Sequence, residues 1–327
     1  MQYRAFGKTD ITVSEVGLGC WQLGGDCWGQ VDDARAQQIL QTALDGGVNF
    51  FDTADVYGGG TSEQRVGRFV RQCGKRVFVA TKLGRGGGLW PNHYDYDHLR
   101  RATESSLKNL GVETIDLTQL HCIPTEVLRQ GEVFDGLRRL RQEGKIRYFG
   151  ASVESVEQAL ICLQHADLAS LQVIFNIFRQ KLIAELFEQA LVRGVALIVR
   201  LPLASGLLSG KMTRSTAFAA GDHRNFNRDG AAFNVGETFA GLPFEKGVEL
   251  ADALKPLVPA GMTMAQMAMR WILDFSPVTV VIPGATKVEQ VLSNNSASDL
   301  PPLGEALHHQ LRDFYTARVA PHIRGPY

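Results

Sequence analysis

The sequence predicts an α/β fold of one domain, a (β/α)8 TIM barrel over residues 1–327 with long loops at the C-terminal face of its strands. Eight short apolar runs alternate with longer segments of helical period, as βα units do around a parallel sheet. Several runs are continuously apolar, which indicates strands buried on both faces. Because no long linker rich in Pro or Ser divides the chain, one closed barrel is favoured over an open doubly wound sheet.

The predicted strands follow the apolar runs in chain order, at residues 13–20, 48–52, 77–83, 115–121, 148–152, 171–176, 195–201 and 278–283. Helices are expected between them, and some of their ends are visible in the sequence. Thr61 with Gln64 and Thr263 with Gln266 predict capping boxes at helix starts. Glycines that precede the second and seventh runs predict helix ends in the left-handed conformation.

Two long segments follow predicted strands and lack a regular pattern. Residues 84–97 contain three consecutive glycines, and residues 212–243 are rich in Gly, Asn and Phe. Loops of this length in a compact domain are usually functional or mobile, so we expect both at the mouth of the barrel. After residue 298 we expect one more helix near 305–318, which either braces the barrel or forms a third wall of the pocket.

The composition excludes several classes of function. Lys and Arg number 34 and Asp and Glu number 34, which disfavours electrostatic capture of nucleic acid or of an anionic membrane. No apolar stretch reaches the roughly 18 residues of a membrane-spanning helix, and no signal-peptide pattern follows Met1. The five cysteines are scattered without a CxxC pair, so we expect no metal site and a reducing, cytoplasmic location. The sequence leaves the oligomeric state open.

Four polar residues stand at or just past the ends of predicted strands, where the active site of such a barrel lies: Asp52, Tyr57, Lys82 and His121. Each alone has an ordinary explanation, because an aspartate can cap a helix, a lysine can reach solvent and a histidine can be a satisfied core residue. Together they suit reversible carbonyl reduction. A tyrosine with a pKa of about 10 is a poor acid at neutral pH unless a cation such as Lys82 lies beside it. Asp52 would hold that lysine, and His121 would donate a hydrogen bond to a carbonyl oxygen.

Seven segments in fixed order carry a further pattern: V-S-E-V-G-L-G at 13–19, F-F-D-T-A-D-V-Y-G at 50–58, T-K-L at 81–83, I-D-L-T-Q-L-H at 115–121, G-K-I-R-Y-F-G-A-S at 144–152, P-L-A-S-G-L-L-S-G-K at 202–211 and V-I-P-G-A-T-K at 281–287. In these segments the chain resembles the aldo-keto reductase superfamily over nearly its whole length. The resemblance implies a barrel that binds NADP(H) over its strand ends, without the glycine-rich Rossmann fingerprint. It also implies that Tyr57 is the general acid, that Lys82 and Asp52 activate it, and that His121 orients the carbonyl.

The resemblance implies cofactor contacts as well. Ser152 and Gln172 would clamp the nicotinamide carboxamide, although Val153 stands where an asparagine is common. Arg200 stands near the place of an aromatic that stacks on the nicotinamide, and its planar guanidinium would either stack there or brace a loop.

Two further stretches would hold the rest of the cofactor. The pyrophosphate segment consists of Pro202, Leu203, Ser205, Leu207, Ser209 and Lys211. The adenosine segment consists of Gly284, Ala285, Thr286, Lys287, Gln290 and Asn294, with Ser293 where a glutamate is usual. Thr286 and Lys287 would hold the 2′-phosphate of NADP(H), and NAD(H) is the alternative cofactor if Lys287 is a solvated residue at a helix start.

The substrate pocket is marked only by aromatic residues near the expected mouth. Trp21, Cys27 and Trp28 follow the first run, and Trp90, His93 and Tyr94 lie in the glycine-rich segment. Aromatic faces with a few hydrogen-bonding groups suit a sugar or an aromatic carbonyl, while core packing is the plain alternative. Asn176 and Arg179 would contact either the substrate or nothing.

The function that fits best is an NADP(H)-dependent oxidoreductase that reduces a small-molecule aldehyde or ketone, including sugar carbonyls, with Tyr57 as general acid. An NAD(P)+-dependent sugar or alcohol dehydrogenase is the same chemistry in reverse. Two other classes stay open: a cofactor-sensing regulatory barrel with little turnover, and an aldolase in which Lys82 forms a Schiff base. The aldolase is disfavoured because Asp52 would keep Lys82 protonated.

Overall fold

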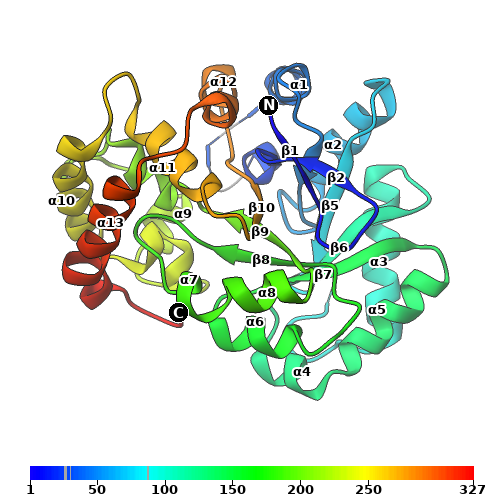
Figure 1. The fold of residues 1–327 in the computed structure, drawn as a ribbon. Coiled ribbons are helices and arrows are strands. Elements are labelled where there is room, and N and C mark those ends of the chain that lie inside the picture. The colour runs from blue at the N-terminus through cyan, green and yellow to red at the C-terminus, as the bar shows by residue number, and fades with distance from the viewer. Residues whose placement is uncertain (26–27, 30, 87) are drawn as a thin grey trace.

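The computed structural model describes residues 1–25, 28–29, 31–86 and 88–327, and within them eight parallel strands form one sheet with helices packed around it (Figure 1). The strands are β3 (Leu18–Gly19), β4 (Phe50–Asp52), β5 (Phe78–Leu83), β6 (Ile115–His121), β7 (Ile146–Ser152), β8 (Ser170–Ile174), β9 (Ala196–Arg200) and β10 (Val278–Val281). Each pairs in parallel with the next along the chain. Bridges from Val16 to Val281 and from Gly19 to Gly284 join the first strand to the last. The predicted (β/α)8 barrel is confirmed.

The first predicted strand differs from the prediction. Residues 13–20 do not form one strand, because β2 (Thr12–Ser14) pairs antiparallel with β1 (Tyr3–Ala5) before the chain turns into β3. The turn is held by the barrel, since the amide of Gly17 donates to the Val281 carbonyl. Apolar side chains explain the hairpin: Phe6, Ile11 and Val13 belong to the same buried cluster as side chains from inside the barrel. The other seven strands lie where predicted, with ends shifted by at most two residues.

The interior of the barrel positions the site directly. Phe50, Ala80 and Leu117 belong to one small buried cluster within the sheet. Because side chains alternate along a strand, the residues two positions later, Asp52 and Lys82 among them, point to the same inner face. The apolar cluster therefore forms the floor on which the polar residues of β4, β5 and β6 stand.

The helices surround the sheet (Figure 1). Among the described residues they are α1 (Asp33–Asp45), α2 (Thr61–Gln72), α3 (Tyr96–Leu110), α4 (Thr125–Gln130), α5 (Glu132–Gln142), α6 (Val156–Cys162), α7 (Leu182–Glu185), α8 (Phe187–Val192), α9 (His223–Phe226), α10 (Phe244–Leu254), α11 (Met264–Leu273), α12 (Val288–Ser296) and α13 (Glu305–Phe314). None of these described helices is long and apolar enough to cross a membrane.

One of the two predicted capping boxes is confirmed. Thr263 and Gln266 cap α11 reciprocally. At α2 the prediction was wrong, because Gly60 is the N-cap residue and the Thr61 hydroxyl donates to the Gly58 carbonyl at 2.7 Å. Residues 58–60 are glycines with positive φ, so the chain enters α2 through a tight turn that leaves no place for a capping serine or threonine.

Both long segments lie at the C-terminal end of the strands, as expected. The 212–243 segment contains α9 and two 3-10 turns, Val235–Glu237 and Phe239–Gly241. Residues after α13 run along it, since the Arg324 amide and guanidinium both donate to the Gly241 carbonyl. The end of the chain therefore braces the long loop, and α13 is shorter than the predicted helix because a π-helical turn, Tyr315–Val319, follows it.

Candidate active site

The four catalytic candidates come together at the carboxyl ends of neighbouring strands. Lys82 Nζ on β5 donates to Asp52 Oδ1 on β4 at 2.5 Å, to the Thr53 carbonyl at 2.8 Å and to Tyr57 Oη at 3.1 Å. Tyr57 follows β4, and its ring lies perpendicular to that of His121 with 5.9 Å between centroids. The Lys82 and Asp52 side chains are almost fully buried, with 1% and 4% of their surface exposed. An ion pair held this tightly fixes the ammonium group beside the tyrosine oxygen.

The second carboxylate oxygen of Asp52 is held from two further strands. Gln119 Nε2 on β6 donates to Asp52 Oδ2 at 3.0 Å, and Gln172 Nε2 on β8 donates to it at 2.7 Å and to Gln119 Oε1 at 3.1 Å. Gln172 was predicted as a cofactor contact, and here its amide nitrogen supports the ion pair of Asp52 and Lys82. Gln119 was not singled out, although its place two residues before His121 puts it on the same strand face.

Burial is the largest influence on the titratable groups around Asp52. It opposes the charge on Lys82, but the Asp52 carboxylate and Tyr57 outweigh it and raise the pKa of Lys82. Burial also raises the pKa of Tyr57, with Lys82 opposing that rise. Burial and the charges of Arg85 and Lys82 lower the pKa of His121 well below its ordinary value. At neutral pH the site therefore holds a charged lysine, a protonated tyrosine and a neutral histidine.

Aromatic side chains cover Tyr57. The Trp21 ring stacks on it with 5.7 Å between centroids, and Trp28 packs edge-on against Trp21. Two rings from the 212–243 loop complete this cover: His223 lies 4.9 Å from Trp21 and 4.4 Å from Trp28, and Phe233 lies 6.3 Å from Trp21. His223 and Phe233 were missed because nothing in a long irregular loop shows which of its residues turn inward.

The remaining substrate candidates lie elsewhere. Trp90 is 50% exposed and lines, with Tyr327, a cavity of about 960 Å³ between the loops after β6 and β7 and the end of the chain. The Tyr94 hydroxyl donates to the Gly84 carbonyl and braces the loop. The His93 ring stacks on His98 of α3. Cys27 lies outside the described residues.

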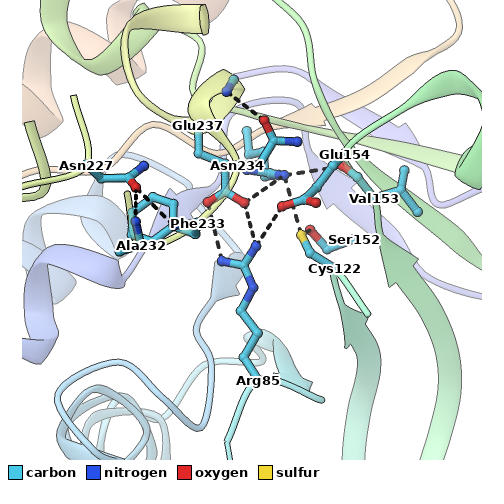
Figure 2. A network of polar contacts seen from close by, with 12 residues as sticks. Arg85, Cys122, Ser152, Val153, Glu154, Asn227, Ala232, Phe233, Asn234 and Glu237 are labelled. Carbon is cyan, nitrogen blue, oxygen red and sulfur yellow. Dashed lines mark hydrogen bonds and ion pairs between the residues drawn. The ribbon is translucent and has the colours of Figure 1, made fainter. Parts of the chain in front are cut away.

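A cluster of charged side chains, which we call the rim cluster, lies beside this site and consists of Arg85, Glu154, Arg200 and Glu237. Figure 2 labels Arg85 between the carboxylates of Glu154 and Glu237. Arg85 Nη2 donates to Glu154 Oε1 at 2.8 Å and to Glu237 Oε1 at 2.7 Å. Arg200 lies 3.6 Å from Glu237 and donates to the Val153 carbonyl at 3.2 Å and to Cys122 Sγ at 3.5 Å. The cluster ties the loops after β5 and β7 to the 212–243 loop.

Local hydrogen bonds explain how the 212–243 loop delivers its side chains. Asn227 Oδ1 accepts from the amides of Ala232 and Phe233, each at 2.9 Å, and so directs the Phe233 ring (Figure 2). Asn234 Oδ1 accepts from the Gly236 amide at 2.7 Å and caps the turn that carries Glu237.

The same place offers donors for a metal ion, but its charges oppose one. The sulfur of Cys122 and carboxylate oxygens of Glu154 and Glu237 lie within 4.8 Å of one another. Both carboxylates are already bound by Arg85, and Arg200 contacts the sulfur. Two guanidinium charges at this distance repel a cation, so the cluster is an ion-pair network and not a metal centre.

The predicted cofactor residues form a band across the barrel mouth. Ser152 ends β7, with Oγ 3.6 Å from Cys122 Sγ, and Arg200 ends β9 with Nε buried and without a partner among the described residues. Residues 201–210 form a tight turn with positive φ at Leu201, Ala204 and Ser205 among its non-glycine residues. Such a turn directs backbone amides toward one side, as anion-binding turns do.

Some of these residues also serve the fold. Ser205 Oγ donates to the Glu237 carbonyl and accepts from the Phe239 amide, and Ser209 Oγ donates to the Gly206 carbonyl. Pro202, Leu203 and Leu207 lie in the same turn, and Lys211 is exposed at its end.

The adenosine candidates lie where the last strand leads into α12. Gln290 Oε1 accepts from the amides of Thr286 and Lys287, Asn294 is buried, and the Lys287 side chain is exposed. Gly284 bridges to Gly19 at the closure of the barrel, and a Cβ there would lie 2.0 Å from Gln22 Oε1. A side chain at position 284 would therefore collide with Gln22.

Asn176 and Arg179 brace loops. Asn176 Nδ2 donates to the Leu201 carbonyl at 3.0 Å, and Arg179 Nη2 donates to the Pro326 carbonyl at 2.7 Å. Arg179 is almost wholly buried, so its bond connects the loop after β8 to the end of the chain. The sequence left these two residues as contacts of the substrate or of nothing, and the structure shows instead that both bond to loop backbone.

Comparison with known proteins agrees with this geometry. A family model described as "Aldo/keto reductase family" matches residues 15–315. The chain belongs to the aldo/keto reductase family. It is 32% identical to aldo-keto reductase YhdN of Bacillus subtilis, covering 89% of this chain and 87% of that one, and 30% identical to an NADH-specific methylglyoxal reductase of Escherichia coli, covering 90% and 92%.

A solved structure, the glycerol dehydrogenase of Gluconobacter oxydans, superimposes with a TM-score of 0.80 at 32% identity and covers 99% of this chain and 98% of that one. As an aldo/keto reductase, the protein is an oxidoreductase that acts on carbonyl or alcohol groups.

Proposed function

We propose that the protein is a cytoplasmic, NADP(H)-dependent reductase that converts a small-molecule aldehyde or ketone, including sugar carbonyls, to the alcohol. The observation that carries the proposal is the buried chain of contacts from Asp52 through Lys82 to Tyr57, with 2.5 Å and 3.1 Å between successive polar atoms. This arrangement places a positive charge beside the phenol oxygen of Tyr57 at the strand ends.

The side chains then have separate roles in the reduction. A bound nicotinamide cofactor supplies the hydride. Tyr57 Oη gives its proton to the carbonyl oxygen, and the Lys82 ammonium stabilises the phenolate that remains. Asp52 keeps the lysine charged, and neutral His121 donates a hydrogen bond to the oxygen as negative charge gathers on it. Trp21 and Trp28 shield the reacting atoms from water and offer apolar faces to the substrate.

The proposed cofactor site follows the band across the barrel mouth. Ser152, Gln172 and Arg200 would hold the nicotinamide end, and the buried Nε of Arg200 is a donor that lacks a partner among the described residues. The 202–211 turn with Lys211 suits the pyrophosphate, because its positive-φ residues turn amides toward an anion. The stretch from Gly284 to Asn294 would hold the adenosine, with Thr286 and Lys287 at the 2′-phosphate.

The protonation of Tyr57 favours reduction over oxidation at neutral pH. In the oxidative direction Tyr57 must accept a proton, which requires its phenolate form. Because burial raises the pKa of Tyr57, that form is scarce at neutral pH. An alcohol dehydrogenase, which the similarity to a glycerol dehydrogenase suggests as the second candidate, would therefore work best in alkaline solution.

The test is titration of the protein with NADPH and with NADH, followed by quenching of its tryptophans, together with turnover of aldehydes, keto-sugars and aldoses. We expect saturable binding, tighter for NADPH, and we expect Tyr57→Phe to lower kcat by about 10²- to 10⁴-fold with unchanged cofactor affinity. Tyr148→Phe is the matched control, since that hydroxyl bonds to Asp10, far along β7 from Ser152.

Three results would contradict the proposal. Equal loss of binding and turnover in Tyr57→Phe would give the tyrosine a structural role. Tight cofactor binding without turnover of any carbonyl would favour a regulatory barrel. Failure of both cofactors to bind, with a substrate adduct trapped on Lys82 by borohydride, would favour an aldolase.

A further inference from the structure

The rim cluster is an unusual concentration of charge in a sheltered place. Its side chains are 6% to 20% exposed, and its two guanidinium groups face two carboxylates. The cluster is connected to the strand ends, because Arg200 contacts Cys122 Sγ, and that sulfur lies 3.6 Å from Ser152 Oγ. The catalytic mechanism described above does not use Arg85, Glu154 or Glu237.

The net charge of the rim cluster depends on pH. Burial and the neighbouring Glu237 raise the pKa of Glu154 to about 7, against the pull of Arg85 and Arg200. Burial works against the charge of Glu237 too, but Arg85 and Arg200 outweigh it and hold the pKa of Glu237 well below its ordinary range. Both arginines stay charged. The cluster therefore has no net charge when Glu154 is ionised and one positive charge when Glu154 is protonated.

We propose that the rim cluster discriminates between the oxidised and the reduced nicotinamide cofactor through the proton on Glu154. This inference rests on the proposed function, which places the nicotinamide between Ser152 and Arg200. The oxidised ring carries a positive charge and the reduced ring carries none. A protonated Glu154 leaves the cluster positive and so weakens binding of the oxidised form alone, whereas an ionised Glu154 removes that repulsion.

Linkage requires the converse. If loss of the Glu154 proton favours the oxidised cofactor, then binding of the oxidised cofactor must favour loss of that proton. We therefore expect proton release near neutral pH when NADP+ binds and almost none when NADPH binds. The phosphate groups are the same in both forms, so their own titration cancels when the two affinities are compared.

Of the two carboxyls in the rim cluster, Glu154 is the one with a pKa of about 7. The groups that face it come from several packed elements. Arg85, Arg200 and Glu237 surround it, and the charge of Arg179 also acts on it. Burial raises the pKa of the Cys122 thiol. The Glu154 amide donates to Gln158 of α6. Around the cavity that Glu154 also lines, Glu157 pairs with Arg129 and Lys181 pairs with Glu185.

Among the residues that the structure describes, Asp55 also has a pKa in this range, because burial and Glu63 raise it to about 7. It lies in the turn before Tyr57, with its amide bonded to the Lys82 carbonyl. Asp55→Asn is therefore the matched control for Glu154→Gln, because each variant removes one titrating carboxyl at nearly constant shape.

The experiment measures the dissociation constants of NADP+ and NADPH by tryptophan quenching from pH 6 to pH 8.5. In the wild-type protein and in Asp55→Asn we expect the ratio of the NADP+ constant to the NADPH constant to fall about tenfold as pH rises. In Glu154→Gln we expect the ratio to stay constant, at its low-pH value. Calorimetry of wild-type binding in two buffers of different ionisation enthalpy measures the proton release and needs no variant.

The outcomes separate this inference from the function beneath it. Three outcomes would overturn the role of Glu154: a pH-independent ratio in the wild type, a pH dependence that remains in Glu154→Gln, or a pH dependence that is lost in Asp55→Asn. In each case saturable cofactor binding would still support the proposed reductase function. Equal proton release with both forms would overturn it as well. Failure of both forms to bind would overturn the proposed function and this inference together.

Discussion

Two charge clusters lie side by side at the mouth of this barrel, and they are built differently. The inner one, Asp52 with Lys82, Gln119 and Gln172, is carried by strands and is almost fully buried. The rim cluster is carried mainly by loops, and Arg85 and Glu154 keep about a fifth of their surface exposed. In the inner cluster one cation meets one carboxylate, and two amides satisfy the remaining oxygen.

The difference shows how one fold combines a fixed site with an adjustable one. Strand register sets the inner cluster, because Asp52 and Lys82 stand on neighbouring strands of a closed ring. Only Arg200 of the rim cluster lies on a strand, so the geometry of the cluster depends on the positions of three loops: those after β5 and β7, and residues 212–243. We expect the inner cluster to control the chemical step and the rim cluster to control the cofactor.

The largest expected effect on kcat comes from replacing one cation of each cluster by methionine and comparing the two variants. Lys82→Met should lower kcat by about 10³-fold, because Tyr57 loses the cation beside its oxygen and Asp52 is left buried without its partner. Arg85→Met removes the cation that binds both Glu154 and Glu237, yet we expect kcat to fall less than about tenfold. Steady-state kinetics with one aldehyde, and cofactor titration of both variants, measure the contrast. Comparable losses of kcat would show that the rim cluster shares in the chemical step.

The sequence predicted the Asp52 and Lys82 pair of the inner cluster but missed Gln119 and most of the rim cluster, for a physical reason. Side chains alternate along strands, so Asp52, Lys82 and His121 could be placed at strand ends from the apolar runs alone. Gln119 carried the same signal, two residues before His121. Glu237 and His223 carried none, because a loop of 32 residues has no period, and its fold depends on side chains such as Asn227 that bond to its own backbone.

Errors in the fold prediction arose in the same way. Residues 13–20 were predicted as one strand because their apolar content is continuous. In the structure Val13 lies in the β1–β2 hairpin at the end of the barrel, whereas Leu18 pairs with β4 in the barrel sheet. At α2 the glycines before Thr61 determine where the helix starts. A search for capping residues does not detect the backbone turn that these glycines form.

A smaller effect is expected at Asp55, which lies in the turn between Asp52 and Tyr57, with its amide bonded to the Lys82 carbonyl. Its carboxyl lies below the glycine-rich loop, since a Cβ on Gly86 would lie 3.2 Å from Asp55 Oδ2. Burial and Glu63 raise the pKa of Asp55 to about 7, so the folded state holds this proton more tightly than the unfolded state does. The stability from neutral Asp55 is complete below the unfolded pKa and is lost as pH rises through about 7.

Between pH 5 and pH 8 the wild type should therefore lose about 2–3 kcal/mol of unfolding free energy relative to Asp55→Asn. Urea unfolding of both proteins at several pH values measures the difference. Parallel curves would show that Asp55 is ionised throughout and that the loop opens enough to hydrate it.

The smallest effect is expected at the outer edge of the rim, where Arg324 fastens the end of the chain to the 212–243 loop. Its guanidinium contacts Asp229 at 2.7 Å, but the Asp229 side chain is 74% exposed. The same guanidinium also donates to the carbonyls of Gly241, Arg228 and Leu242. Asp229→Asn should therefore change the unfolding free energy by less than about 0.5 kcal/mol, because exposed ion pairs contribute little. Arg324→Met, which also loses the carbonyl contacts, should cost about 1–2 kcal/mol by the same urea measurement. If Asp229→Asn proved as costly as Arg324→Met, the ion pair and not the carbonyl contacts would hold this loop, as the ion pair of Asp52 and Lys82 holds the inner cluster.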